Sequence, residues 1–203
     1  IISIISVSTS TNILILVAAC CFLGYLYQGP PFRFGYKGLG EPLCWLAFGP
    51  FAYSAVLIAL NPSNIYFEDI PWKVSLLLGS GPSLATTLVL FCSHFHQISE
   101  DKKHGKNSPL VRLGAKKGSQ FVPWIIFTIY IFQLFTIVYG FIPVFCILYL
   151  LSFPQATRLI NLLKSSYAKP SAIKNCKFIA IKFQTLNGIG LITGLIFNYL
   201  LNK

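Results

Sequence analysis

Long apolar runs separated by short polar segments dominate the chain. Five stretches hold no Asp, Glu, Lys or Arg, and they are residues 1–32, 42–67, 74–99, 118–157 and 183–202. About 20 apolar residues in a helix cross a hydrocarbon core of roughly 30 Å. The pattern therefore predicts an all-α, multi-pass membrane helical bundle with at least one span in each stretch.

The stretch 118–157 is the ambiguous one. Its 40 residues are too many for one crossing and just enough for two. Gly140 and Pro143 offer a break between two helices. Two crossings there give six spans, predicted at about 5–27, 42–60, 74–92, 121–139, 141–156 and 180–201.

The distribution of basic residues supports six spans. Lys and Arg accumulate in loops on the side that is not translocated. With six spans, fourteen of the sixteen basic residues lie on one side, and only Lys73 and Lys203 lie opposite. We therefore predict one membrane domain over residues 1–203, whose loops 28–41, 93–120 and 157–179 share the face that carries the active site.

The composition narrows the class of protein further. Only 10% of the residues are charged, against roughly a quarter in a soluble domain, and the net charge is +11. Membrane topology and attraction to anionic lipid account for the basic residues on one face. We therefore expect a lipid bilayer as the partner, and we expect neither nucleic acid nor an obligate protein partner. The six cysteines form no CxxC pair, and no GxSxG, HExxH, P-loop or GxGxxG pattern occurs.

The first polar loop has more backbone shaping than a connector needs. It contains four glycines and two prolines before Pro42, together with Arg33, Lys37 and Glu41. Glycine lets backbone N–H groups approach an anion, and Arg and Lys suit phosphate. The alternative is a rigid turn that carries two ordinary loop charges.

The loop after the third predicted span holds two of the five acids. If the helix continues through it, Gln97 and Asp101 stand one turn apart with Glu100 beside them. Such oxygen ligands suit Mg²⁺, and the following basic residues, Lys106 and Arg112 among them, would face a polyanion. The alternative is a solvated loop whose acids pair with lysines. His94 and His96 are spaced too closely for a zinc pair and are expected to cap or line a polar mouth.

The loops resemble those of a known family. The stretches YQGPPFRFGYKGLGEPLCWLAFGP (27–50) and HFHQISEDKKHGKNSPLVRLG (94–114) resemble the UbiA-type superfamily of membrane prenyltransferases, in particular its MenA branch. That family has nine helices and two acidic motifs, so the resemblance implies six spans of an expected nine. Together with the absence of Met and the start at Ile1, it implies that three helices and the first motif lie upstream.

The resemblance implies a function and roles for individual residues. The implied enzyme is a Mg²⁺-dependent aromatic prenyltransferase that joins an allylic diphosphate, phytyl diphosphate by preference, to 1,4-dihydroxy-2-naphthoate with loss of CO₂ and diphosphate. The implied metal contacts are Glu100 and Asp101, with Gln97 as an orienting ligand where much of the superfamily has Asp. The other implied contacts are Arg33, Lys37, Lys106 and Arg112 to the diphosphate, and Tyr25 and Tyr27 facing the allylic cation.

Several alternatives remain open at this stage. A homogentisate-type prenyltransferase and a menaquinone-pathway enzyme with a polyprenyl donor are close variants. A transporter usually carries ionisable residues deep within its spans, and the five apolar stretches hold no Asp, Glu, Lys or Arg. A non-catalytic remnant is the third alternative. The implied location is a plastid or cyanobacterial membrane, with the basic loops facing the stroma or cytoplasm.

Overall fold

The computed structural model describes residues 11–60 and 70–203, and within these ranges all regular structure is helical. Five helices are long and apolar enough to cross a membrane, and they run over Gly40–Leu60, Trp72–His96, Pro109–Val138, Val144–Ser166 and Ser171–Leu201. A shorter apolar helix, α2 (Thr11–Gln28), precedes them. The multi-pass helical bundle is thus confirmed. The start of the predicted first span lies outside the described residues, as do Glu68 and Asp69.

Each span is built from one or more helical segments. The predicted second span consists of α3 (Gly40–Leu46), a π-helical turn η1 (Ala47–Phe51) and α4 (Ala52–Leu60). The third is α5 (Trp72–Ser93), which a 3-10 turn, η3 (His94–His96), extends. Then follow the short α6 (Ile98–Lys103), the long α7 (Pro109–Val138), a 3-10 segment η4 (Val144–Ser152), α8 (Phe153–Ser166), α9 (Pro170–Ile173) and α10 (Cys176–Leu201).

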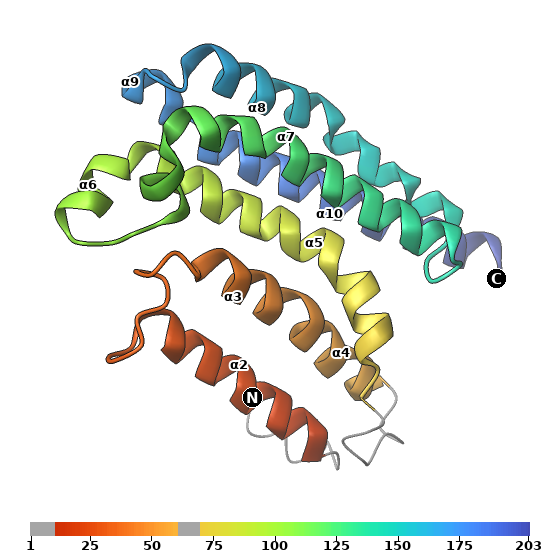
Figure 1. Cartoon of the computed structure of the whole chain (residues 1–203). Coiled ribbons are helices and arrows are strands. Elements are labelled where there is room, and N and C mark those ends of the chain that lie inside the picture. Colours follow the sequence, from red (N-terminus) through yellow and green to blue (C-terminus); the bar gives the residue numbers. More distant parts are fainter. Residues whose placement is uncertain (1–10, 61–69) are drawn as a thin grey trace.

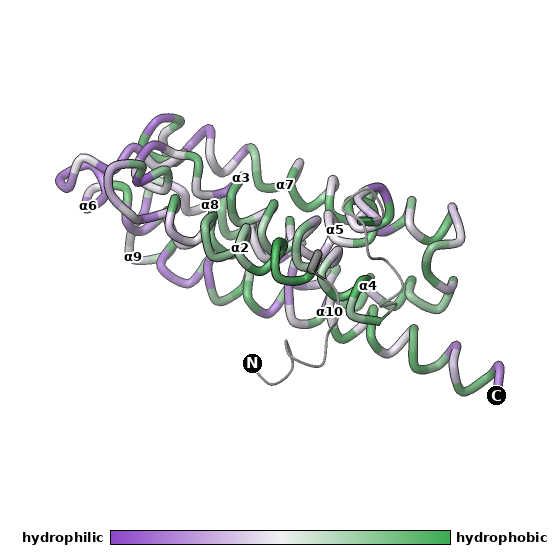
Figure 2. Tube along the Cα trace, turned by 90° about the horizontal axis from the view of Figure 1, so that it is seen from below, coloured by the Kyte–Doolittle hydropathy of each residue, from purple (hydrophilic) through white to green (hydrophobic). Residues whose placement is uncertain are grey.

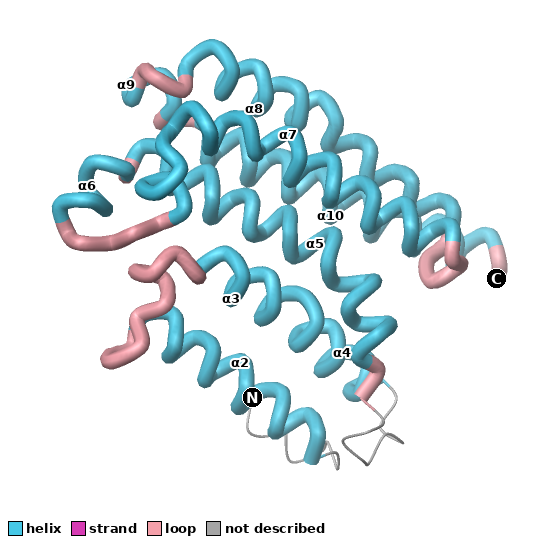
Figure 3. The backbone as a smooth tube through the Cα atoms, in the orientation of Figure 1, coloured by secondary structure: helices cyan, strands magenta, loops and turns pink. Residues whose placement is uncertain are grey.

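The predicted break between the fourth and fifth spans is confirmed. Gly140 has a φ of 73°, which favours glycine, and Pro143 is the extended residue before η4. The chain therefore turns over residues 139–143 and crosses back (Figure 3).

The predicted loops 93–120 and 157–179 are wrong in extent, because both are largely helical. α7 begins at Pro109, where a proline suits the first helical turn, and the fifth span continues to Ser166 instead of ending near 156. The prediction used charge-free stretches, but lysine and arginine can extend from a helix end into water, so helices run past the last apolar residue.

The core lies between α5, α7, α8 and α10. Its fully buried members include Leu88, Ile129, Leu159 and Phe183, one from each helix. Glycines bring α10 and η4 closest together, since a Cβ on Gly190 would overlap the backbone oxygen of Leu148. Small residues at such contacts are how helices associate in lipid, where no hydrophobic force joins them.

A buried polar cluster ties three of these elements together. The side-chain amides of Gln133 on α7 and Asn187 on α10 exchange hydrogen bonds of 2.6 and 3.0 Å. Asn187 also approaches the Ser152 hydroxyl, which bonds with Tyr130 at 2.9 Å. The buried amides are thus satisfied by one another, which fixes the register of α7 against α10.

The connections at one end of the bundle lie together. Figure 1 shows the segment after α2, the α6 segment and α9 at the same end, with the C-terminus at the other. Two hydrogen bonds tie the segment after α2 to the chain that follows α6. The Asn107 N–H donates to the Tyr36 oxygen at 2.7 Å, and the Arg112 guanidinium in the first turn of α7 donates to the Lys37 oxygen. Hydrophilic residues gather at this end, whereas the middle of the bundle is hydrophobic (Figure 2).

Candidate active site

The segment between α2 and α3 folds back on itself and packs against the α6 segment. The N–H groups of Phe34 and Gly35 donate to the oxygens of Leu26 and Tyr27 at 2.9 Å each. Gly38 has a φ of 74°, and a Cβ there would lie 2.6 Å from the Asn107 oxygen. Glycine at 38 therefore permits both the turn and the close approach of the two segments.

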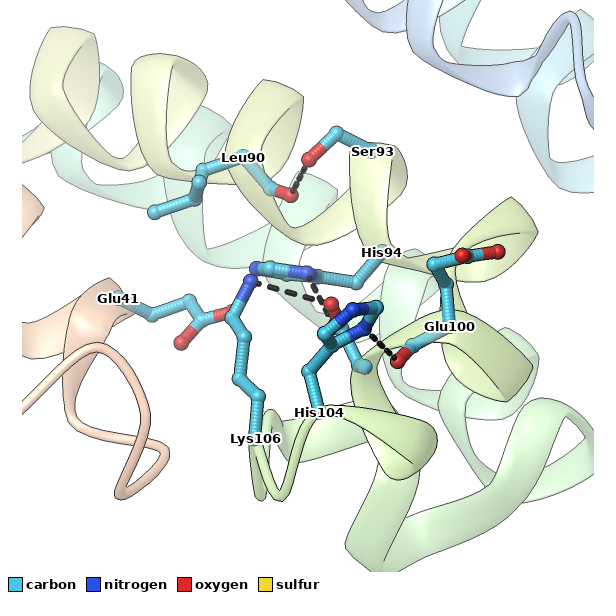
Figure 4. A network of polar contacts seen from close by, with 8 residues as sticks. Glu41, Leu90, Ser93, His94, Glu100, His104 and Lys106 are labelled. Atoms are coloured by element: carbon cyan, nitrogen blue, oxygen red, sulfur yellow. Dashed lines mark hydrogen bonds and ion pairs between the residues drawn. The ribbon is translucent and has the colours of Figure 1, made fainter.

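A polar network lies where these segments meet the end of α5 (Figure 4). His94 is only 4% exposed, and its Nδ1 lies 3.1 Å from Oδ2 of Asp101. The other Asp101 oxygen lies 3.3 Å from Nζ of Lys106. On the opposite edge of the imidazole, Nε2 lies 3.7 Å from Oε1 of Glu41. One histidine thus stands between two carboxylates that come from different segments.

Glu41 carries an unsatisfied buried atom. Its Oε1 has no hydrogen-bond partner, although its side chain is only 12% exposed. A buried carboxylate oxygen without a donor is costly, so such an atom marks a place where a ligand or water belongs. Figure 4 shows the side chain reaching from α3 toward His94.

The structure brings Asp101 and Lys106 together but separates Glu100 from them. Asp101 is buried, whereas Glu100 is exposed, and Figure 4 shows its carboxylate directed away from Glu41 and Lys106. Gln97 is half-buried at the residue before α6, and its backbone oxygen accepts the Asp101 N–H at 2.7 Å. The α5 helix does not continue through this segment, as the prediction supposed, but Gln97 and Asp101 still lie one turn apart.

The predicted diphosphate contacts from the first loop point to solvent. Arg33 and Lys37 are exposed and lie over the rings of Tyr36 and Phe34, at 5.9 and 5.6 Å from the ring centres. Arg112 is exposed as well, and its guanidinium holds the Lys37 backbone. In the described part of the chain, these three cations form no ion pair with a carboxylate.

The two predicted tyrosines take different positions. The Tyr25 hydroxyl donates to the Pro30 oxygen, and its ring is half exposed. Tyr27 faces inward, where its ring lies against Gly35 and Gly40 and lines a cavity. Tyr27 is therefore the tyrosine placed to contact a molecule in the bundle, and Tyr25 braces the loop.

An apolar cavity of about 760 Å³ opens beside the polar network, between α2, α3, η1, α5 and α10. Its volume is within the range of roughly 300–1,000 Å³ that small-molecule sites have. Ser93 and Tyr27 lie at the end near His94, and Leu90, Val89 and Thr86 continue along α5 into the bundle. The polar network of Glu41, His94, Asp101 and Lys106, called the mouth below, therefore lies beside one end of an apolar chamber.

The described residues fit Mg²⁺ only with ligands from elsewhere. They contain no group of three His, Cys, Asp or Glu side chains that could hold a metal. Mg²⁺, however, commonly takes one or two protein carboxylates and completes its shell with water and substrate phosphate. Asp101 and the unsatisfied oxygen of Glu41 are carboxylates available at the mouth, so the donor set suits a metal that arrives with a phosphorylated substrate.

The importance of Glu41 and His94 does not follow from the sequence alone. The pattern of the glycine-rich loop gives Glu41 no role, and it predicts for His94 only that it caps or lines a polar mouth. Their proximity joins residues 53 positions apart in the sequence. A signal was present in the low number of acids, since a chain with five acids has few to spare.

Comparisons with known proteins agree on one family. The sequence profile of the UbiA prenyltransferase family matches residues 1–181. A 2-carboxy-1,4-naphthoquinone phytyltransferase from Synechocystis is 37% identical over 183 residues, which are 90% of this chain and 57% of that protein. The chloroplastic protein of the same name from Arabidopsis thaliana is 36% identical over 191 residues, which are 93% of this chain and 50% of that one. The chain thus spans about half the length of these curated relatives, and no solved structure matches it.

Proposed function

Because the chain belongs to the UbiA prenyltransferase family, we propose that the protein transfers a phytyl group from its diphosphate to a naphthoate-type ring, with loss of CO₂ and diphosphate, on the route to phylloquinone. The observation that carries the proposal is the polar network of Glu41, His94, Asp101 and Lys106 at the opening of an apolar cavity. A substrate with a charged head and a long apolar tail needs a polar network for the head and an apolar cavity for the tail. The names of the two relatives indicate the phytyl donor and the naphthoquinone acceptor.

The cations at the mouth bind the diphosphate in this proposal. Lys106 exchanges its Asp101 partner for a phosphate oxygen, and Arg33, Lys37 and Arg112 turn inward from their exposed positions. Asp101 and Glu100 would hold Mg²⁺ together with the unsatisfied oxygen of Glu41, and Gln97 would be an orienting ligand. The metal would neutralise charge on the leaving diphosphate. Glu100 requires a change of side-chain rotamer to take part, whereas Asp101 is already in place.

The transfer itself balances without an added base. The allylic C–O bond breaks and its electron pair leaves with the diphosphate. The ring carbon that bears the carboxylate then forms the new C–C bond, and the electrons of the bond to the carboxylate return to the ring as CO₂ departs. Tyr27 lines the cavity near this point, where an aromatic face favours the allylic cation. The apolar chamber keeps water from capturing it.

The acceptor has two candidate oxidation states. The relatives' names specify the quinone, and the resemblance of the loops suggested the 1,4-dihydroxy form, which has two more electrons and two more protons. An electron-rich ring captures a cation better, so we propose the dihydroxy form as the reacting acceptor. An anaerobic assay with each form, with and without a reductant, distinguishes them.

The experiment that tests the function uses the whole protein in membranes, supplied with phytyl diphosphate, acceptor and Mg²⁺. We expect phytylated naphthoquinol and CO₂ from the wild type and a rate at least about 100-fold lower for Asp101→Ala. Ser99→Ala, on the exposed face of the same short helix, is the matched control and should keep the wild-type rate. Turnover of homogentisate in place of the naphthoate would make the protein a prenyltransferase of another pathway.

Rivals from other classes are tested by the same assay. A transporter is less favoured, because the acids of the described residues lie at the mouth and not in the middle of spans. Wild-type protein that folds but forms no prenylated product from either acceptor would favour a remnant or a transporter. We further propose a photosynthetic membrane as the location, since the relatives come from a cyanobacterium and a chloroplast.

A further inference from the structure

Two cavities follow one another along α5 and α10, and the same two side chains border both. On α5 and α10 the cavity beside the mouth reaches as far as Thr86 and Gln184, and on the facing side it extends to Ala52 of α4. A second cavity of about 430 Å³ begins at the same pair and continues past Ala85 and Pro82 on one side and Ile192 on the other. Thr86 and Gln184 therefore stand at the boundary.

The order of residues shows which cavity is deeper. On α5 the distance from His94 increases through Ser93, Leu90 and Thr86 to Pro82, and each residue of a helix adds roughly 1.5 Å. α10 starts at the mouth end, where the Cys176 thiol donates to the Cys92 oxygen at 3.0 Å, and runs inward to Gln184. Both helices thus put the second cavity farther from the mouth.

A hydrogen bond closes the boundary. Nε2 of Gln184 donates to Oγ1 of Thr86 at 2.7 Å, and the Thr86 hydroxyl donates in turn to the Pro82 oxygen at 3.3 Å. A primary amide within an apolar span is costly unless it is bonded, so this pairing holds the Gln184 side chain across the gap between α5 and α10.

From this arrangement we infer that the Gln184–Thr86 pair is the floor of the tail cavity and limits the length of the isoprenoid chain that the enzyme accepts. The inference rests on the proposed function, because the occupant is the apolar tail of the allylic diphosphate whose head lies at the mouth. A tail that fits the first cavity stops at the pair, and a longer tail must displace it to enter the second cavity.

Two substitutions of Gln184 separate its bulk from its hydrogen bond. Gln184→Ala removes the side chain and joins the two cavities. Gln184→Leu keeps most of the volume and loses the amide. Thr86→Ala, a smaller change on the opposite wall, provides a second opening should Gln184→Ala fail to fold. Thr128→Ala, on an exposed part of α7, is the control for loss of a hydroxyl in a span.

The experiment compares kcat/KM for a C20 and a C40 allylic diphosphate with the same acceptor. We expect Gln184→Ala to raise the C40-to-C20 ratio about tenfold, which is the effect of a small change in pocket size, while Gln184→Leu and Thr128→Ala keep the wild-type ratio. If Gln184→Ala and Thr86→Ala are both active and both keep the wild-type C40-to-C20 ratio, the Gln184–Thr86 pair does not limit chain length. An equal rise in Gln184→Leu overturns the steric form of the inference.

A binding measurement that does not depend on turnover tests the Gln184–Thr86 barrier even if the proposed function is wrong. Thr185 lines the second cavity, and Cys44 lines the first. In a Thr185→Cys protein, a bound C20 diphosphate should protect Cys44 from maleimide and leave Cys at 185 reactive. Adding Gln184→Ala should let the C40 diphosphate protect both positions. Protection at 185 by the C20 chain without that substitution shows that the pair is no barrier.

Discussion

At the scale of single residues, His94 is the side chain that joins the two halves of the mouth. It contacts Asp101 from α6 on one edge and Glu41 from α3 on the other. A residue that orients a charged ligand commonly changes metal affinity or activity 10–100-fold when it is lost. We interpret His94 as a positioning residue, because it holds the carboxylate that would meet the substrate.

Replacement of His94 by Phe should therefore weaken the site without removing any proposed ligand. We expect activity to fall about 10–100-fold and the Mg²⁺ concentration at half-maximal activity to rise. Protection of Cys44 from maleimide by phytyl diphosphate should shift to higher Mg²⁺ as well, which reports binding and not turnover. His104→Phe is the matched control, since His104 is exposed and, among the described residues, its imidazole hydrogen-bonds only with the Glu100 backbone oxygen. Equal effects of the two substitutions would contradict the role.

Replacement of Glu41 should change stability and activity in opposite directions. Its buried Oε1 accepts no hydrogen bond, so the cost of burying the negative charge there is poorly compensated. Glu41→Gln should leave the melting temperature unchanged or raised while kcat/KM for the donor falls at least about tenfold. Thermal unfolding in detergent and the prenylation assay measure the two quantities. A variant that loses stability but retains full activity would make Glu41 a structural residue.

The sequence predicts part of the site. It does not show in which direction each side chain points. Asp101 and Lys106 were identified from their types and spacing, and the structure places them in contact. Adjacent residues of a helix point about 100° apart, so Glu100 and Asp101 cannot both face one mouth without a change of rotamer. The contact between Glu41 and His94 depends on how α3 packs beside α5, which no local pattern encodes.

At the scale of helices, the apolar pattern located the spans well and their ends poorly. The break near Gly140 and Pro143 followed from backbone chemistry that is visible in the sequence. The start of α7 at Pro109 did not follow from the sequence, because charged residues in the first turns of this helix are typical of a loop. Gly114, with a φ of 76° and a ψ of 159°, further interrupts α7 and sets the Arg112 turn apart from the rest. Charge counting therefore does not locate the ends of these helices.

The packing of α10 gives a test with a matched pair of glycines. A Cβ at Gly190 would overlap the η4 backbone, whereas a Cβ at Gly188 meets nothing within 4 Å. Gly190→Ala should destabilise the protein by about 1–3 kcal/mol through overpacking. Gly188→Ala should be neutral or stabilising by up to about 1 kcal/mol through helix propensity. Reversible unfolding in mixed micelles measures both, and equal effects would show that α10 does not approach η4 this closely.

At the scale of the molecule, the position of the mouth follows from connectivity. In the part of the chain that the structure describes, six helical rods in alternating directions bring every second connection to the same end. The two connections that form the mouth are those after α2 and after α5. The third is the α8–α9 segment, which contacts the end of α5 near His96. The basic residues gather at this end for reasons of topology, and they also supply the cations that an anionic substrate needs.

Sidedness provides the last test, because all three connections must face one compartment. Exposed residues outside the mouth serve as reporters: Lys103→Cys on α6 and Ser165→Cys on α8 at one end, and Tyr139→Cys and Lys203→Cys at the other. A membrane-impermeant maleimide added to sealed, oriented vesicles should label the first two from one side and the last two from the opposite side. Unsubstituted protein, with its six native cysteines, gives the background.

Labelling of Lys103→Cys and Ser165→Cys from opposite sides would remove a span from the bundle and separate α8 from the mouth. Labelling of both from the stromal or cytoplasmic side would assign the diphosphate-binding end to that compartment, where the basic loops were predicted to face.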